Sequence, residues 1–235
     1  MADPSDRTPP GDPWSIQLTY RHDQRWWYDA NDEPEAWHVS ADVYDDSGTH
    51  VDAHVGDMHI VAVDIYDTED PFGLLDGEDA DLGLVAEVIF DPAAGGLYPR
   101  LDEVLQPLGS RILILSAVRL APAWRGFGLG VLLAGTALRK LSGGARAGVC
   151  YPAPLDDPAT GEGFDEDIDR GGDHAEGLND PVGRQRAVTA LGEVWAQLGF
   201  EPFRDGVHVL DLNLVTLQEN LARLRKRAER HRTYD

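Results

Sequence analysis

Polar and apolar residues alternate along the first half of the chain, a pattern typical of strands with one buried face. WSIQLTY (14–20) and WHVSADVY (37–44) alternate in this way, and residues 50–67 read as a longer pair with a hairpin turn at Gly56-Asp57. LGLVAEVIFD (82–91) predicts a further strand. We therefore expect a flexible leader over residues 1–13 and then a β-meander. A short helix should follow the meander within residues 99–108.

The second half changes to longer apolar runs and helical periods. RILILSAVRL (111–120) is almost continuously apolar, as expected of a central strand buried on both faces, and Pro122 ends it. Leucines and alanines at helical spacing then predict a helix over residues 128–141. The remaining expected elements are a short strand at 146–152, a helix over 183–198 stopping at Gly199, a hairpin turning at Asp205-Gly206, and a helix over 217–232.

This order of elements, a meander followed by β-α-β-α-β-β-α, predicts one α/β (α+β) domain over residues 14–214. Its sheet should be mixed and mostly antiparallel, flanked by helices. Residues 152–182 are rich in Asp, Gly and Pro and read as a long acidic loop. Residues 215–235 form a basic C-terminal helix with a leucine stripe. We expect it to dock on the protein or to self-associate as a homodimer, rather than to bind nucleic acid.

The net charge of the chain limits the binding partners that we expect. The chain has 42 acidic and 20 basic residues and a formal net charge of −22. Such a surface argues against binding to nucleic acid or anionic membranes and is compatible with a cationic substrate. The simpler alternative is that the charge only keeps the protein in solution and binds no partner. Cys150 is the single cysteine, so no intramolecular disulfide is expected. No stretch approaches the ~20 apolar residues of a membrane helix, and we expect a cytoplasmic protein.

The segment RGFGLG (125–130) places three glycines at alternate positions between the central strand and the next helix. A dinucleotide fingerprint needs glycine where Val131 stands, and a P-loop needs Lys-Ser/Thr directly after Gly130, so both are excluded. The first amides of the helix lack intrahelical partners and, with Arg125, favour a phosphate group. A tight strand-to-helix turn without a ligand is the simpler alternative.

In this setting the segment resembles the acetyl-CoA signature of the GNAT N-acetyltransferase superfamily, Gln/Arg-x-x-Gly-x-Gly/Ala. VRLAP (118–122) is similar to the end of the family's central strand, LGF (198–200) to the end of a later helix, and the resemblance covers about residues 111–214. It implies acetyl-CoA as co-substrate, a backbone N–H near Leu120 polarising the thioester carbonyl, and a binding site formed by Val118, Arg119, Leu120, Arg125, Gly126, Phe127, Gly128, Leu129 and Gly130.

The resemblance also implies direct attack of a primary amine, on a small molecule or a protein and in some cases polycationic, on the thioester. The family's acid tyrosine is replaced by Trp195, which we expect to pack in the core, and its strand glutamate by Ser116 and Arg119. Glu87 is the candidate base, because an unpaired carboxylate among apolar residues has a raised pKa; the alternative is a solvent-facing or arginine-paired carboxylate. Tyr151 is the candidate acid.

Two other functions stay open at this point. One is a GNAT-like module that binds acetyl-CoA as a sensor or structural element without catalysis, and the other is an acyltransferase that uses a longer acyl-CoA.

No metal site is predicted. His50, Asp52 and His54 share a strand face without further ligands. Residues 165–176 have EF-hand-like spacing, but Arg170 stands where the tight turn needs glycine, so a solvated loop or attraction of a cationic acceptor is favoured. The acidic positions of this loop are Asp165, Asp167, Asp169, Asp173 and Glu176.

Overall fold

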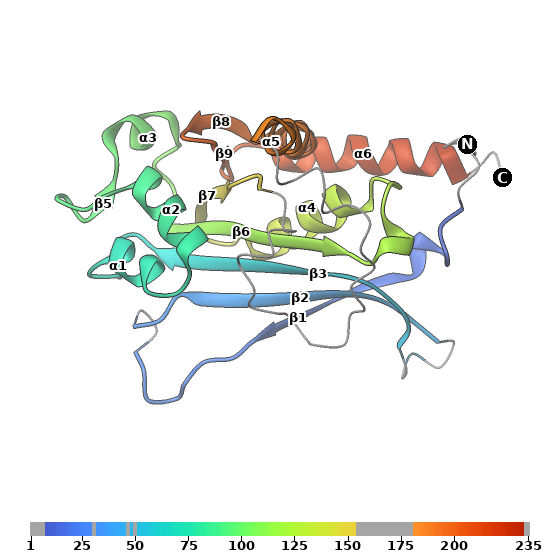
Figure 1. The fold of residues 1–235 in the computed structure, drawn as a ribbon. Helices are drawn as coiled ribbons and strands as arrows, with labels where there is room; N and C mark the ends of the chain where they lie inside the picture. Colours follow the sequence, from blue (N-terminus) through green and yellow to red (C-terminus); the bar gives the residue numbers. More distant parts are fainter. Residues whose placement is uncertain (1–7, 30–31, 46–47, 49–50, 154–180, 233–235) are drawn as a thin grey trace.

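The computed structural model describes residues 8–29, 32–45, 48, 51–153 and 181–232. Seven strands form the main sheet, in the order β1-β2-β3-β6-β7-β9-β8 (Figure 1). They are β1 (Ile16–His22), β2 (Glu35–Tyr44), β3 (Val51–Asp64), β6 (Arg111–Leu120), β7 (Ala145–Cys150), β8 (Glu201–Arg204) and β9 (Val207–Asp211). Two short strands, β4 (Phe90–Asp91) and β5 (Gly96–Leu97), pair separately.

Helices cover both faces of this sheet. They are α1 (Pro71–Asp76), α2 (Ala80–Ile89), α3 (Pro99–Val104), α4 (Leu129–Leu141), α5 (Pro181–Ala196) and α6 (Thr216–Arg232). Side chains of α4, α5 and α6 share a core cluster with one face of the sheet, and those of α1, α2 and α3 share another with the opposite face. Within β3, neighbouring residues such as Ile60 and Val61 accordingly belong to different clusters. In Figure 1, α1 to α3 gather at the left end.

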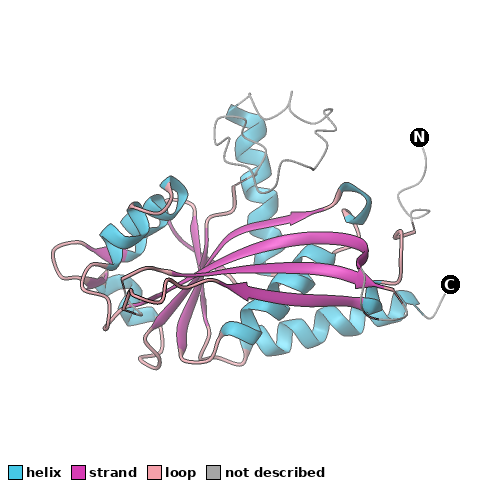
Figure 2. Ribbon diagram, turned by 90° about the horizontal axis from the view of Figure 1, so that it is seen from below, coloured by secondary structure: helices cyan, strands magenta, loops and turns pink. Residues whose placement is uncertain are grey.

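Every pairing in the main sheet is antiparallel except that of β6 with β7. The strands fan out, as expected for a twisted sheet (Figure 2). The prediction of a mixed, mostly antiparallel sheet with flanking helices is therefore confirmed.

The parallel pair β6–β7 separates halfway along β6. Its register runs from Arg111 opposite Ala145 to Leu115 opposite Cys150, where β7 ends. The rest of β6, residues 116–120, pairs with β3 on one side and, within the described residues, has no strand neighbour on the other. A bulge at Ser116 precedes this stretch, because Ile60 faces Leu115 while His59 faces Ala117. A wedge thus opens between the two central strands.

Two sequence predictions in the first half are wrong. Most of residues 82–91 lie in helix α2 (Ala80–Ile89) rather than in a strand, because their apolar positions also follow a helical period and Asp79 caps the helix; only Phe90 and Asp91 are extended, in β4. The hairpin turn expected at Gly56-Asp57 is absent: β3 runs through both residues. A Cβ atom at Gly56 would lie 2.3 Å from the carbonyl oxygen of Arg119, so glycine serves a close approach of β3 to β6.

The predicted elements of the second half are present with shifts of a few residues. The turn between β8 and β9 contains Asp205 and Gly206, both with positive φ, and Gly199 follows α5 with φ 103°. Residues 1–7 of the expected leader and His50 lie outside the described residues, as do residues 154–180, which hold most of the acidic loop and its EF-hand-like spacing.

Helix α6 docks on the protein through its apolar face. Leu217, Leu221 and Leu224 are buried in the cluster that also holds α4 residues. Arg225 donates a hydrogen bond to Thr136 of α4 (3.0 Å). Its remaining described basic side chains point away from this core and are exposed, namely Arg223, Lys226, Arg227 and Arg230.

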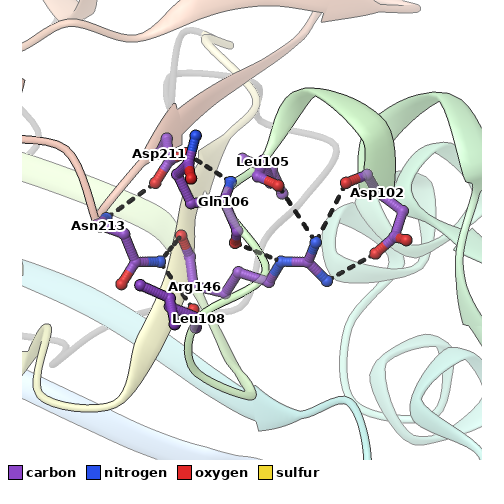
Figure 3. A network of polar contacts seen from close by, with 7 residues as sticks. All are labelled: Asp102, Leu105, Gln106, Leu108, Arg146, Asp211 and Asn213. Atoms are coloured by element: carbon purple, nitrogen blue, oxygen red, sulfur yellow. Dashed lines mark hydrogen bonds and ion pairs between the residues drawn. The ribbon is translucent and has the colours of Figure 1, made fainter.

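A buried arginine ties α3 to the sheet. The side chain of Arg146, on β7, is 3% exposed and donates to the carboxylate of Asp102 (2.6 Å) and to the carbonyl oxygens of Asp102, Leu105 and Gln106 (Figure 3). These are carbonyls at the end of α3, which have no partner within the helix. Asp211 accepts from the amide of Gln106 (2.8 Å), which extends the network to β9.

Candidate functional site

The glycine segment forms the turn between β6 and α4. Pro122–Trp124 make a 3₁₀ helix, and the Trp124 side chain is buried, which anchors the turn to the core. Gly126 and Gly128 have φ of 87° and 72°, in the left-handed region that favours glycine. Gly128 is the N-cap of α4 and supplies no side-chain cap, so the first amides of the helix keep their hydrogen-bonding capacity for another acceptor.

This turn brings several of the predicted cofactor residues together. Arg125 Nε donates to the carbonyl oxygen of Leu120 (2.8 Å), which holds the guanidinium at the end of β6. A Cβ atom at Gly130 would lie 3.6 Å from Leu120 Cδ1 and 4.0 Å from Val118 Cγ1. The end of β6 and the start of α4 therefore border the same space beside the wedge.

Three of the predicted cofactor side chains point elsewhere. Phe127 and Leu129 pack into a core cluster that contains Trp124, so only their backbone atoms border the turn. Arg119 lies opposite Asp57 in the β3–β6 register, on the sheet face opposite to Val118. Any ligand contact from these three residues has to come from the main chain or, for Arg119, on the other face.

A histidine and a serine meet at the point where β6 leaves β7. His59 Nδ1 lies 2.8 Å from Ser116 Oγ, and Ser116 Oγ also donates to the His59 carbonyl (3.2 Å). Burial lowers the pKa of His59, the nearby His38 lowers it further, and the carboxylate of Asp79 at the start of α2 partly offsets both. His59 is therefore a neutral imidazole at pH 7, able to accept a proton.

A polar row continues from His59 along the same face of the sheet. His54 is within hydrogen-bonding distance of Asp42 (2.7 Å) and Asp57 (2.8 Å), and Asp57 also pairs with His38 (3.0 Å). Burial lowers the pKa of His54, but its hydrogen bonds to both carboxylates and their charge outweigh burial and hold this pKa above its ordinary value. The row therefore places two hydrogen-bonded carboxylates among histidines on this face, with Arg119 opposite Asp57.

The structure places the predicted catalytic residues as follows. Glu87 lies on the exposed side of α2 and is not the buried carboxylate suggested by the sequence, because residues 80–89 are helical. Tyr151 directly follows β7, where the wedge opens, and its ring packs against the β8–β9 turn: a Cβ atom at Gly206 would lie 2.9 Å from its Cε2. Trp195 is 8% exposed and packs in the core, as predicted.

Sequence reasoning missed His59. Strand alternation puts it on the same side of β3 as Asp57, but only the register of β3 with β6, including the bulge at Ser116, brings the imidazole to the serine. His54, considered for a metal, instead lies between two carboxylates.

In the part of the chain that the structure describes, no group of three or more His, Cys, Asp or Glu side chains is placed to hold a metal ion. No helix in the described ranges has the length and apolarity needed to cross a membrane. Compared with protein-family models, curated proteins and solved structures, the chain gives no significant match in any of the three.

Proposed function

We propose that the protein is a GNAT-like N-acetyltransferase that transfers an acetyl group from acetyl-CoA to a primary amine. The observation that carries this proposal is the wedge between β6 and β7, which opens directly beside a glycine turn at the start of α4. A strand with one free edge next to an anion-binding helix start suits a cofactor that consists of an extended amide chain and a pyrophosphate.

The residues at this place fit such a cofactor. The amides of the first turn of α4 and the Arg125 guanidinium would bind the pyrophosphate, where glycines leave space: nothing lies within 4 Å of a Cβ atom built on Gly128. The backbone edge of residues 118–120, which has no strand neighbour among the described residues, would pair with the pantetheine amides as an added strand, apart from the Leu120 carbonyl, which accepts from Arg125. Acetyl-CoA supplies the thioester that the amine attacks.

His59 takes the role of general base in this proposal. Its lowered pKa keeps the imidazole neutral, so that it can accept a proton from the acceptor's ammonium group and leave the free amine to attack the thioester, with Ser116 Oγ at 2.8 Å to orient the ring. Tyr151, where β7 ends, stays the candidate donor of a proton to the leaving thiolate.

The alternative is a module that binds acetyl-CoA without catalysis. The core packing of Trp195 favours it, because α5 then offers no acid where the related enzymes have a tyrosine.

Calorimetric titration with CoA and acetyl-CoA tests the binding step. Gly130→Glu places a carboxylate in the first turn of α4, where it suits the helix dipole but repels a pyrophosphate. We expect at least about tenfold weaker binding, equivalent to ~1.4 kcal/mol. Gly130→Ala is the matched control, because its Cβ meets only ordinary contacts, and it should bind as the wild type does. Absence of wild-type binding, or equal binding by the glutamate variant, would overturn the proposed site.

Release of CoA thiol across a panel of amines tests the chemistry. His59→Gln should lower kcat and remove the dependence of kcat/KM on a neutral imidazole, while leaving CoA affinity unchanged. Tight binding by the wild type without turnover on any amine supports the non-catalytic module. Accumulation of an acylated Ser116 would refute direct attack, because it requires a covalent intermediate.

A further inference from the structure

Exposed apolar side chains gather at the end of the sheet where β6 and β7 begin and β9 ends. They come from the end of α3, the loop before β6 and the loop after β9, and four of the ten large exposed hydrophobic side chains of the described chain lie here, which is more than chance scatter over the surface explains. These four, 49–64% exposed, form what we call the apolar patch: Val104, Leu108, Leu214 and Val215.

Hydrogen bonds hold the loops of the apolar patch together. The side-chain amide of Asn213 donates to the carbonyl oxygen of Leu108 (2.7 Å). Asp211 accepts from the backbone amides of Gln106 and Asn213, both at 2.8 Å (Figure 3). Arg146 joins the same network to the end of α3. The patch is therefore preorganised, so covering it costs little conformational entropy of the main chain.

Charged residues of opposite sign flank the apolar patch. Glu103 is exposed on α3, which packs on one face of the sheet. Arg139 and Lys140 are exposed in the last turn of α4, which packs on the opposite face. The chain after α4 contacts the loop before β6, because the amide of Ser110 donates to the carbonyl oxygen of Gly144 (3.1 Å). Across this end of the sheet the order is therefore acid, apolar, base.

This order is self-complementary under a two-fold rotation. When two copies meet patch against patch, Glu103 of one protomer faces Arg139 and Lys140 of its partner, and the same contact occurs again on the other side of the axis. The apolar centre is then buried between two pairs of opposite charges. Each copy has a formal net charge of −22, so two copies repel one another unless their contact brings bases to acids in this way.

We propose that the apolar patch is the centre of a two-fold symmetric interface between two copies of this chain, in which Glu103 of one protomer pairs with Lys140 of its partner. The wedge and the glycine turn lie toward the other end of β6. The interface goes beyond the proposed acetyl transfer, and its formation requires no CoA.

Sedimentation velocity of the full chain over a range of concentrations tests the apolar centre. The wild type should sediment as a dimer whose fraction falls on dilution. Val215→Glu places two carboxylates at the centre, one from each protomer, and should weaken the dimer at least about tenfold. Val51→Glu is the matched control: this valine is 52% exposed at the start of β3, whereas the other end of β3 pairs with the start of β6, so the dimer should persist.

Exchange of charges tests the symmetry. Glu103→Lys and Lys140→Glu should each weaken the dimer about three- to tenfold, because each places like charges opposite one another on both sides of the axis. An equimolar mixture of the two variants should dimerise again, since Glu103→Lys in one chain then faces Lys140→Glu in the other. Only a second copy of this chain as occupant predicts that recovery, because mixing does not repair a folding defect.

The proposal is overturned if the wild type sediments as a monomer at every concentration, if Val51→Glu weakens the dimer as much as Val215→Glu does, or if the two charge variants fail to associate on mixing. A monomeric wild type that binds phosphatidylcholine vesicles, and loses this binding with Val215→Glu, would assign the patch to a lipid surface and also overturn it. Failure of CoA binding would leave all of these results unaffected.

Discussion

Replacement of Arg146 by methionine should destabilise the protein strongly. The guanidinium is 3% exposed and satisfies the carbonyl oxygens of Asp102, Leu105 and Gln106 at 2.9–3.3 Å, besides its ion pair with the Asp102 carboxylate. Methionine refills much of the volume but donates no hydrogen bond. The carbonyls of Asp102 and Leu105 then lose this donor, whereas that of Gln106 still accepts from the amide of Leu108 (2.8 Å).

The size of the destabilisation depends on which partners of Arg146 are hydrated after the substitution. Breaking a buried charge pair by removing one member costs roughly 3–5 kcal/mol. Here the Asp102 side chain is 56% exposed, so its carboxylate is rehydrated once the arginine is gone. The cost is then mainly that of the carbonyls, and we expect a loss of about 3 kcal/mol in the free energy of unfolding. Asp102→Asn leaves the buried guanidinium without its counter-ion, but the asparagine side-chain oxygen can still accept from it and the carbonyl hydrogen bonds remain, so this change should cost about 1–2 kcal/mol, less than Arg146→Met.

Urea unfolding followed by tryptophan fluorescence and far-UV circular dichroism measures these differences as shifts of the midpoint at constant slope. Arg223→Met, at an exposed position of α6, is the matched control and should lie within about 0.5 kcal/mol of the wild type. If Arg146→Met costs less than 1 kcal/mol, or if Asp102→Asn costs as much as Arg146→Met, the carbonyls are not what the arginine stabilises and the reasoning fails.

Two further predictions concern packing and pH. Gly135→Ala in α4 would place a Cβ atom 2.6 Å from Leu198 Cδ2 and 2.8 Å from Leu221 Cδ2. The cost of overpacking, roughly 1–3 kcal/mol, should therefore exceed the gain of ~1 kcal/mol in helix propensity, and we expect a lower melting temperature. Gly130→Ala in the same helix should not lower the melting temperature. His54 has a raised pKa in the folded protein, so its contribution to stability is fully present below its unfolded pKa of ~6.5 and is lost as the pH rises through the folded value. His54→Gln should thus lower the urea midpoint at pH 5.5 and change it little at pH 8.5; an equal decrease at both pH values would contradict the charge argument.

An element can be predicted from the sequence when its local pattern determines its structure, and cannot be predicted when the structure depends on long-range strand register. Strands 16–22 and 37–44 and helix 129–141 follow from periodicity alone, and the turn at Asp205-Gly206 from its residues. Residues 82–91 do not, because a mainly apolar run with single interruptions at Gly83 and Glu87 suits a buried helix and a buried strand equally. Packing of this segment on the sheet determines that it is a helix.

The candidate site shows the same division. The glycine turn is visible in the sequence because its conformation is local: Gly126 and Gly128 have the left-handed backbone that glycine accommodates. The pairing of His59 with Ser116 depends on a bulge in a non-local strand pair, so it could not be predicted. The wrong prediction of a turn at Gly56 has a related cause, because the close approach of two backbones requires glycine, as many turns do.

The position of β6 has a kinetic consequence for folding. Strands β1, β2 and β3 pair in sequence order, so this meander forms from neighbouring segments of the chain. The next pairing joins β3 to β6, and even its nearest residues, Asp64 and Arg111, are separated by the whole segment that contains α1, α2 and α3. Closing so long a loop is entropically costly and slows folding. The two halves of the sheet therefore become one cooperative unit only when β6 has paired with β3, and destabilising this strand should slow the formation of the glycine turn and of the wedge beside it together.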